Sequence, residues 1–481
     1  MNILGRASFC SGSHSSDFAS KTGSSGQPGC NGRREENHDE APLKVTVVRL
    51  VNTIFSIRRL GQELTINLGI GGAAAALALG LKGHSVKILD AAPKLLEVGA
   101  GIQVAPNMLR LLDRWGVGNS VREKGVAIQE VHILKYKDQQ SLGRAPVTRK
   151  FGEQFVVHRA DLHNALVQKM QELPNVELKL NSAVKGVDFD QASVALNSGE
   201  TVEGDVVLGA DGIKSVIRPQ LLGEDHGPIP TGDAVYRVMI PAEQMREDPE
   251  LRPFIEEAKG YRWVGPHRHI MAYPVRGHQL FNMVLAHPER RELEESWTVK
   301  GSKKELLAEY EGWDSRLVKM LQKAPEGDVL EWKLCSHAPL DTWIRGKVTL
   351  MGDACHPMLP YVAQGAAQAC EDAAALSTVL SLVEDKNDIP LALKAFERSQ
   401  KQRAERVQGT AAQTRHNLHL VDGPEQIERD RLFAAVEKGE KNPDQWGDPE
   451  TQKFLWEWDA EAKASESWAA VSSKSGVKAR L

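Results

Sequence analysis

Glycine and acidic residues occur together at three places in the sequence where parts of a nucleotide cofactor could bind. The first is GIGGAAAALAL, in which Gly69 and Gly72 begin a small-residue helix and Asp90 follows 21 residues after Gly69. Glycines at a strand–helix turn let the backbone approach a pyrophosphate, and an acid about 20 residues later accepts hydrogen bonds from a ribose. The pattern is incomplete, and small residues at a tight helix contact would look similar.

The second place is GADGIKSVIRP, residues 209–219, where Asp211 and Gly212 end a predicted strand. Asp-Gly is also a common β-turn pair, which is the simpler interpretation. Ser215 and Arg218 follow at a fixed spacing. With these two residues, the stretch is better explained by binding of a pyrophosphate and of a second nucleotide.

The third place is LMGDACHPMLPYVAQGAAQ, residues 350–368. Asp353 leaves a hydrophobic strand, a His-Pro-x-x-Pro loop follows, and Gly365 and Ala366 begin a helix. A carboxylate in this position can bind a polyol chain, and the positive end of a helix can stabilise an anionic ring. A surface loop with chance prolines is the alternative, but the order of these features favours a flavin site.

Hydrophobic patterns predict the elements that would position these motifs. LKVTVV (43–48) and HSVKILD (84–90) are predicted strands, and residues 70–81 form a helix between them, which together make a βαβ unit. Residues 51–68 interrupt this unit, because RRLGQELTIN is not a buried strand.

The rest of the chain predicts an α/β protein with a separate β-rich part. Its predicted elements are helices at 105–115 and 158–170, strands within 176–212 and at 347–356, a strand-like block at 230–335, a helical stretch at 364–420, and a polar segment with several tryptophans at 440–481.

Composition excludes several classes of function. The 481 residues carry a formal charge of −4, which gives no reason to expect nucleic acid or an anionic membrane as a partner. The five cysteines form no CxxC pair, so we expect no disulfide framework, no metal site and a reducing, cytoplasmic location. No apolar run reaches the roughly 18–20 residues of a membrane helix. Residues 1–42, rich in Ser and Gly, predict a disordered tail.

Four motifs together carry a resemblance to a known family: GADG-x-x-S-x-x-R, MGDACHPMLPYVAQGA, VGAGIQVAPN (98–107) and HRADL (158–162). In this order they resemble the single-component FAD-dependent aromatic hydroxylases, or group A flavoprotein monooxygenases. The most similar branch is the salicylate hydroxylase type with its relatives from fungal secondary metabolism. The resemblance covers residues 43–458 except 51–68, and it is specific for the family rather than for the substrate.

The resemblance implies an α/β fold with a Rossmann-like FAD-binding domain of the p-hydroxybenzoate hydroxylase (PHBH) type. An inserted β-sheet substrate domain and a C-terminal helical region complete the implied fold. The corresponding parts are a tail at 1–42, the first part of the FAD-binding domain at 43–225 with an anomalous insertion at 51–68, the substrate domain at 226–335, the second part of the FAD-binding domain at 336–400, and a helical region and tail at 401–481.

Positions for the cofactor are also implied by the resemblance. The implied FAD contacts are Gly69 and Gly72 at the first turn, Asp90 at the adenosine ribose, Ala100 and Gly101 beside the flavin, Arg159 of HRADL, Asp211 and Gly212 at the pyrophosphate and the nicotinamide cofactor, Asp353 at the ribitol, and Gly365 and Ala366 at the isoalloxazine.

Two further residues are similar to the pair that binds the phenolate in fungal relatives. Arg237 lies in AVYRVMIP, 26 residues after Asp211, and Tyr273 lies in MAYPV on the neighbouring predicted strand. A guanidinium suits a phenolate or carboxylate, and the tyrosine could donate to the same oxygen. The alternative is that Arg237 is a surface cation and that Tyr273 packs within the sheet.

The activity implied is NAD(P)H-consuming hydroxylation of a phenolic or other aromatic substrate through a flavin C4a-hydroperoxide. The implied partners are a small aromatic substrate and dioxygen, with neither nucleic acid nor a membrane span, and a homodimer is an assembly left open. The alternative is a non-catalytic or FAD-deficient protein, because the N-terminal glycine pattern is interrupted.

The interruption itself suggests a hypothesis. Deleting residues 51–68 joins VTVVRL to GIGG and restores the length of the family's first strand and turn, with Arg49 where the first glycine belongs. We therefore hypothesise that this segment is translated intron or a similar error in the gene model. If the segment is present in the protein, we expect poor affinity for FAD.

Overall fold

The structure is a computed structural model that describes residues 43–49, 68–95, 99–224, 227–289, 301–327 and 329–475. The predicted tail at 1–42 and residues 51–67 of the predicted insertion lie outside the described residues. Within the described part of the chain, no helix combines the length and the apolar composition needed to cross a membrane.

A six-stranded sheet carries the first βαβ unit, with the strand order β18-β19-β12-β1-β2-β8. All neighbouring strands are parallel except β18 and β19. Its strands are β1 (Lys44–Arg49), β2 (Ser85–Asp90), β8 (Val176–Lys179), β12 (Val206–Gly209), β18 (Ile344–Arg345) and β19 (Val348–Leu350). The predicted strands at 43–48 and 84–90 are confirmed as β1 and β2, which pair from Lys44–Ser85 to Arg49–Asp90.

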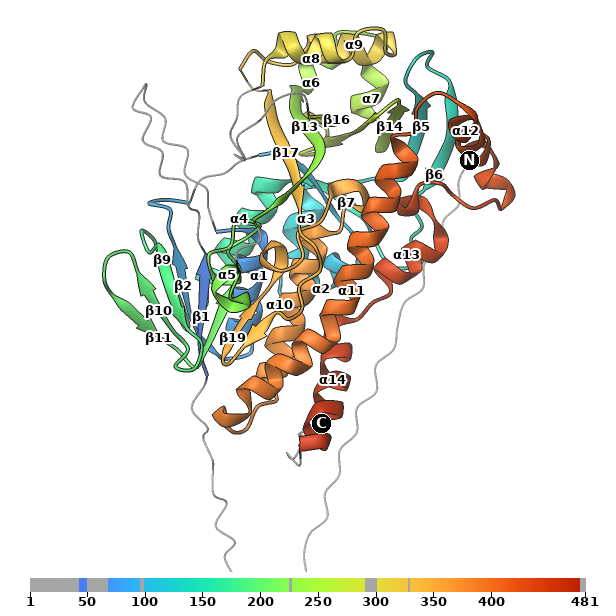
Figure 1. The fold of residues 1–481 in the computed structure, drawn as a ribbon. Helices are drawn as coiled ribbons and strands as arrows, with labels where there is room; N and C mark the ends of the chain where they lie inside the picture. The colour runs from blue at the N-terminus through green and yellow to red at the C-terminus, as the bar shows by residue number, and fades with distance from the viewer. Residues whose placement is uncertain are drawn as a thin grey trace, which may run out of the picture. The chain divides into compact units, whose positions relative to one another are not determined.

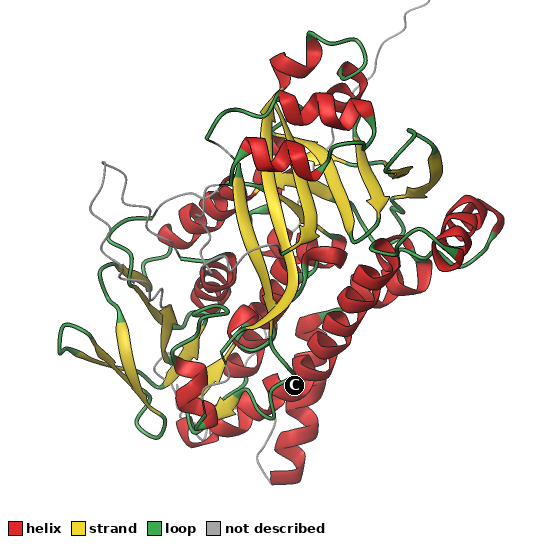
Figure 2. Ribbon diagram, turned by 45° about the horizontal axis from the view of Figure 1, so that its top comes forward, coloured by secondary structure: helices red, strands yellow, loops and turns green. Residues whose placement is uncertain are grey.

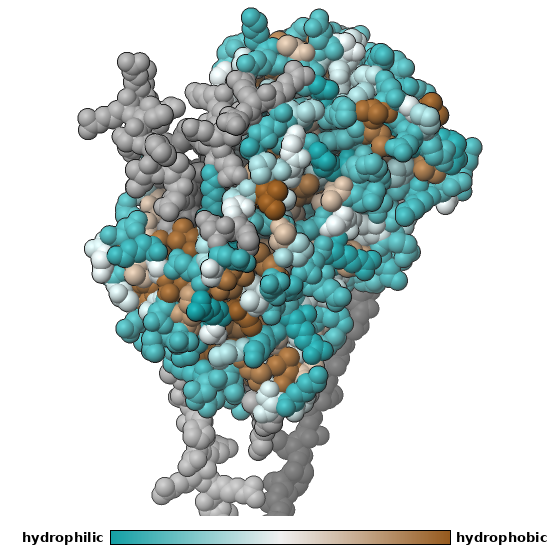
Figure 3. Space-filling view, viewed as in Figure 1, coloured by the Kyte–Doolittle hydropathy of each residue, from teal (hydrophilic) through white to brown (hydrophobic). Residues whose placement is uncertain are grey.

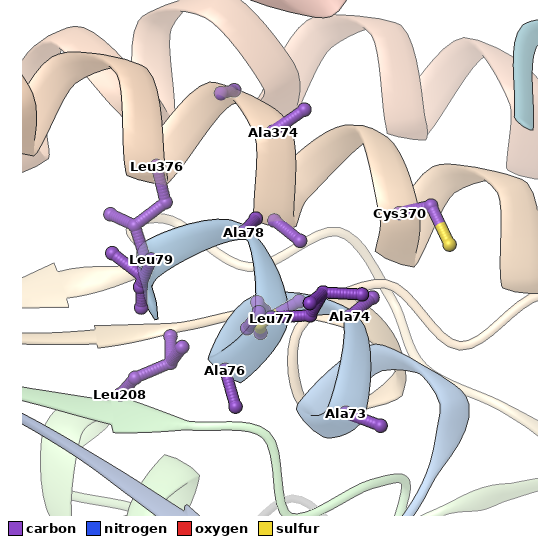
Figure 4. Close-up of a cluster of buried hydrophobic side chains, with 14 of the residues drawn as sticks. Ala73, Ala74, Ala76, Leu77, Ala78, Leu79, Leu208, Cys370, Ala374 and Leu376 are labelled. Carbon is purple, nitrogen blue, oxygen red and sulfur yellow. The ribbon is translucent and has the colours of Figure 1, made fainter. Parts of the chain in front are cut away.

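Small residues let α1 (Ile70–Leu81) pack closely against α10 (Gly365–Ser381). A Cβ placed on Gly71 would lie 3.1 Å from the Cβ of Ala369, so the two backbones approach closely. Figure 4 shows alanines and leucines of α1 facing Cys370, Ala374 and Leu376 of α10, with Leu208 of β12 on the other side. The predicted helix at 70–81 is confirmed.

A seven-stranded sheet forms the β-rich part, with the order β17-β13-β16-β15-β14-β5-β6. Its strands are β5 (Glu130–Lys135), β6 (Ser141–Pro146), β13 (Ile229–Pro241), β14 (Lys259–Gly265), β15 (Arg268–Val275), β16 (Leu280–Pro288) and β17 (Leu330–Ser336). Neighbouring strands are antiparallel, except for the parallel pair β14 and β5. The sheet therefore extends beyond the predicted range 226–335, since β5 and β6 precede that range. In the folded chain β5 pairs with β14, and β6 pairs with β5.

One face of this sheet is covered by four helices, which Figure 2 shows in red beyond the yellow strands. They are α6 (Ala242–Arg246), α7 (Arg252–Glu256), α8 (Lys303–Glu309) and α9 (Ser315–Gln322). Tyr236, Trp263 and Phe281 pack beneath them in one apolar cluster. Because side chains alternate along a strand, Arg237 and Asn282 point to the opposite face.

The predicted helical stretch at 364–420 is two helices, α10 and α11 (Ile389–Leu418), separated by the 3₁₀ helix Lys386–Asp388. Figure 1 shows both running beside α14 (Ala460–Ser475), in orange and red. α11 continues through residue 400, so the predicted division at 400/401 falls inside a helix. The polar segment at 440–481 is largely helical in its described part, and its Trp446, Trp456 and Trp468 are buried.

The remaining elements connect these layers. Two small sheets have the orders β11-β10-β9 and β3-β7-β4. Their strands and the other described elements are β3 (Gly101–Val104), β4 (Val126–Ala127), β7 (Phe155–His158), β9 (Val184–Asp188), β10 (Ser193–Leu196), β11 (Thr201–Glu203), α2 (Pro106–Arg114), α3 (Gly118–Lys124), α4 (Arg159–Gln171), α5 (Ile217–Leu222), α12 (Pro424–Ala435), α13 (Pro449–Trp456), and 3₁₀ helices at Gly352–Ala354, Pro360–Val362, Val436–Lys438 and Gln445–Gly447. The predicted helices at 105–115 and 158–170 are confirmed as α2 and α4.

Candidate active site

The N-terminus of α1 leaves its first backbone amides available to a ligand. Gly69 precedes the helix with φ −73° and ψ 165°, no side chain of the described residues caps this end, and the first turn holds no acid. Such a helix end carries partial positive charge and unsatisfied N–H donors. Gly72 is tightly enclosed, because a Cβ there would lie 3.1 Å from Leu68 Cδ1. Asp90 ends β2 fully buried, and its Oδ1 accepts a hydrogen bond from the Ala92 amide at 2.8 Å.

Asp211 shapes the turn after β12. Its Oδ2 accepts hydrogen bonds from the amides of Val216 at 2.8 Å and Ile217 at 3.1 Å, whereas its Oδ1 is buried without a partner among the described residues. Burial raises the pKa of this carboxyl, although Ser215 and the two amides oppose the rise. Gly212 has φ +75° and no atom within 4 Å of a Cβ placed on it, so the turn needs glycine and leaves space beside it.

Arg218 joins this turn to the Asp353 loop. Its guanidinium donates to the carbonyl of Ile213 at 2.9 Å and to that of Ala354 at 3.1 Å. The Ser215 hydroxyl accepts a hydrogen bond from the Arg218 amide at 2.9 Å, so the two predicted motif residues are in direct contact. The second and third sequence motifs are therefore held together through one buried side chain.

Asp353 and Arg159 are brought together although 194 residues separate them. Asp353 lies exposed in the 3₁₀ helix Gly352–Ala354, and Arg159 begins α4. Burial lowers the pKa of Arg159, and the negative charge of Asp353 partly offsets this. The loop around Asp353 is fixed by Asp372, which accepts from the Gly352 amide at 2.9 Å and pairs with His356 at 2.6 Å.

The N-terminus of α10 is also open. Gly365 begins the helix, no side chain caps it, and its first turn holds no acid. Among the described residues, no atom lies within 4 Å of a Cβ placed on Gly365, and Ala366 beside it is half-buried. Ala363 turns the chain into the helix with φ +52°.

A buried polar network supports this helix start from behind. Asn107 donates to Gln364 at 3.0 Å and to Glu371 at 2.6 Å. Glu371 also binds the guanidinium of Arg403 with N–O distances of 2.6 and 2.9 Å. Arg403 further donates to the carbonyls of Phe454 and Leu455, so the C-terminal segment is part of the support.

Gly101 is the point where the seven-stranded sheet meets the loop expected beside the flavin. Its amide donates to Asn282 Oδ1 at 2.6 Å, and its carbonyl lies 3.4 Å from the Arg237 guanidinium. A Cβ on Gly101 would lie 2.7 Å from Tyr273 Cε2, so only glycine fits here. The preceding Ala100 accepts from the Arg159 amide at 2.8 Å. The two predicted catalytic residues thus converge on one backbone position.

Arg237 and Tyr273 both keep their protons at neutral pH, although burial shifts their pKa values in opposite directions. Burial lowers the pKa of Arg237 to about 10, which leaves it a cation at neutral pH, and its guanidinium carbon lies 4.5 Å from the centre of the Trp332 ring. Burial raises the pKa of Tyr273, so its hydroxyl stays neutral and can donate. The arrangement offers a cation and a neutral donor to an anionic oxygen.

The residues at these three turns fit FAD. Two uncapped helix ends suit its phosphates and its ring, the orphaned Asp211 Oδ1 is a buried acceptor, and the space at Gly365 admits a group with no side chain in the way.

Comparison with known proteins decides the family. Residues 67–411 match the model of the FAD binding domain family. The FAD-dependent monooxygenase atnJ of Arthrinium sp is 38% identical over 407 residues, covering 84% of this chain and 96% of that protein. The chain belongs to the FAD-dependent monooxygenases. With this assignment, the prediction of an FAD-dependent monooxygenase is confirmed.

Other members place this monooxygenase in the salicylate and 3-hydroxybenzoate hydroxylase type. The 3-hydroxybenzoate 6-hydroxylase 1 of Aquipseudomonas alcaligenes is 36% identical over 382 residues, covering 78% of this chain and 93% of that protein. The solved substrate complex of a salicylate hydroxylase shares the fold with a TM-score of 0.70 and 23% identity, covering 89% of this chain and 98% of that one. CtdE in complex with FAD and a substrate gives a TM-score of 0.75 at 21% identity, covering 90% and 100%. The predicted α/β PHBH-type fold is confirmed.

Sequence reasoning missed two residues of this monooxygenase site, Asn282 and Trp332. Neither belongs to a motif; Asn282 lies in a largely apolar strand and Trp332 lies between Glu331 and Lys333. The signal for Asn282 was available in LFNMVLAH, where an amide interrupts a run of apolar residues in a predicted strand. Trp332 gave no signal, because its contact with Arg237 depends on the pairing of β13 with β17.

Proposed function

We propose that this FAD-dependent monooxygenase hydroxylates an aromatic ring that carries an ionisable oxygen, with NAD(P)H as the reductant. The observation that carries the proposal is the convergence of Arg237 and Tyr273 on Gly101, from the sheet face opposite the four covering helices. The family assignment and the relatives that are named hydroxybenzoate hydroxylases support the same reaction class.

The protein's own groups act on the substrate oxygen. Arg237 binds it as an anion and so increases the electron density of the ring, and Tyr273 donates a hydrogen bond while keeping its proton. Trp332 stacks on Arg237 and limits its rotation. The bound flavin would supply the activated oxygen atom, and Gly69, Gly72, Asp90, Ala100, Arg159, Asp211, Gly212, Asp353, Gly365 and Ala366 are the residues proposed to hold it.

The test is turnover by the purified holoenzyme. NADH or NADPH oxidation would be followed with phenol, 2-hydroxybenzoate and 3-hydroxybenzoate, and products would be analysed by mass spectrometry under ¹⁸O₂. We expect at least one substrate to gain one labelled oxygen. Oxidation of the nicotinamide without labelled product, for these and a wider set of phenols, would contradict the proposal.

A further inference from the structure

Asn282 occupies a position where a polar side chain is costly unless it has a role. It lies in the middle of β16, entirely buried, on the face of the seven-stranded sheet opposite α8 and α9. Its Nδ2 is buried with no hydrogen-bond partner among the described residues. Leaving a buried donor unpaired costs about 1–3 kcal/mol, and native proteins seldom do so without a reason.

The hydrogen bond with Gly101 fixes the orientation of this amide. The Gly101 amide can only donate, so the Asn282 atom 2.6 Å away must be the oxygen. Nδ2 is then the atom that the Gly101 amide does not bind, and it lies 2.7 Å from the position of a Cβ placed on Gly101. The unpaired atom is therefore a donor, and whatever satisfies it must present an acceptor.

A second unpaired donor lies on the adjacent strand. The Nε of Arg237 is also buried without a partner in the described part of the chain. Arg237 pairs with Val284 and Met239 pairs with Asn282, so Arg237 and Asn282 are diagonal neighbours on one face. Tyr273 stands directly opposite Asn282 on β15. Three side chains on three adjacent strands thus lie together on one face, and two of them each carry one buried N–H donor without an acceptor among the described residues.

We propose that Asn282 is a specificity-determining residue that binds the substrate through Nδ2, while its Oδ1 positions Gly101. Arg237 binds one substrate oxygen and Asn282 binds a second acceptor on the same ring. A ligand that offers two oxygen acceptors satisfies both donors, whereas a group that only donates, such as an ammonium, satisfies neither. This inference rests on the proposed function and adds to it the recognition of a second oxygen.

The test is equilibrium binding to the FAD-loaded enzyme without reductant, read from the change in flavin absorbance. Asn282→Asp keeps an oxygen for the Gly101 amide but replaces the donor with a second, anionic oxygen. We expect affinity for 3-hydroxybenzoate to fall at least about 100-fold, because a donor becomes a repelling charge. Affinity for phenol, which has one oxygen, should fall less than about fivefold, and the affinity for FAD should change less than about twofold.

A matched control is Asn387→Asp, which makes the same change at an exposed position and should leave both affinities as in the wild type. If Asn282→Asp does not fold, Asn282→Leu, of similar size and uncharged, is expected to bind 3-hydroxybenzoate about tenfold more weakly.

Three results would decide against the inference in different ways. Unchanged binding of 3-hydroxybenzoate by the Asn282 variants would make Asn282 only structural. A weaker affinity for FAD with unchanged ligand binding would mean that Nδ2 faces the cofactor. A wild-type enzyme that binds neither phenol, 3-hydroxybenzoate nor any of the wider set of phenols would contradict the proposed function itself, and the inference with it.

Discussion

The N-termini of α1 and α10 both present uncapped amides, yet they are built in opposite ways. At α1 the glycine is enclosed by apolar atoms, with Leu68 Cδ1 3.1 Å from a Cβ placed on Gly72. At α10 no atom lies within 4 Å of such a Cβ on Gly365, and the support is the buried network of Asn107 and Glu371 behind it. One helix start depends on close packing of small residues, and the other on hydrogen bonds from distant segments.

The two helix starts also differ in how many segments of the chain support them. The α1 turn follows β1 in the chain, with 18 residues, 50–67, between Arg49 and Leu68. The α10 turn takes its partners from α2, α11 and the segment around Phe454, so no single loop controls it. The start of α10 is therefore held by more segments of the chain than the start of α1.

The largest effect is expected from removing the charge behind α10. Glu371→Leu leaves Arg403 buried without its carboxylate, so the free energy of unfolding should fall by about 3–5 kcal/mol. Denaturation in urea measures it. The control Glu405→Gln breaks the i,i+4 pair with Lys401 on α11, the helix that carries Arg403, and should cost less than about 1 kcal/mol. An equal loss of unfolding free energy in both variants would show that the buried network does not give the start of α10 any special support.

Adding one methyl group at each helix start should separate packing from ligand space. Gly72→Ala should lower the free energy of unfolding by about 2 kcal/mol, because the new Cβ crowds Leu68. Gly365→Ala should change it by less than about 0.5 kcal/mol but weaken FAD binding, since the methyl occupies space proposed for the ring. Thermal unfolding and FAD titration of both variants test this, and the reverse pattern would refute it.

Removing the interruption should strengthen only the α1 end. Deleting residues 51–68 leaves Leu50 before Gly69, and because residue 68 is also leucine, the buried position is kept. We expect FAD to bind about tenfold more tightly, a gain of about 1.4 kcal/mol, because the strand then leads directly into the turn. Quenching of flavin fluorescence measures the dissociation constant. An unchanged value would show that the segment does not hinder the turn, and sequencing the transcript tests its origin.

The smallest effect concerns the loop that precedes α10. Burial disfavours the charge on His356, but Asp372 and Asp353 outweigh it and raise the pKa of His356 above its ordinary value. The raised pKa in the folded state makes a contribution to stability that is complete below the ordinary pKa of 6.5 and is lost as pH rises through the raised value. His356→Asn should flatten this decline when unfolding is measured from pH 6 to 9. A variant with the same slope as the wild type would contradict the assignment.

The sequence predicted the elements whose patterns are local. Helices at 70–81, 105–115 and 158–170 have regular apolar spacing and were placed within two residues of their observed bounds. The three glycine–acid motifs also lie where expected, because each needs only one strand and one helix start.

Contacts between segments that are distant in the chain could not be predicted from the sequence. The strands at 130–146 carry no signal that they pair beside β14, and the network of Glu371 depends on residues near 107, 364 and 403 that share no motif. The convergence of Arg237 and Tyr273 was expected from family resemblance, whereas Asn282 became visible only through its contact with Gly101.

The contacts of Arg403 can form only in a certain order during synthesis of the chain. Its guanidinium holds the carbonyls of Phe454 and Leu455, and Arg110 holds those of Trp456 and Trp458. These residues leave the ribosome after both sheets and α10 have been synthesised, so the Arg403 guanidinium of the nascent chain lacks these two backbone acceptors until they arrive. Cofactor loading should accordingly follow translation rather than accompany it.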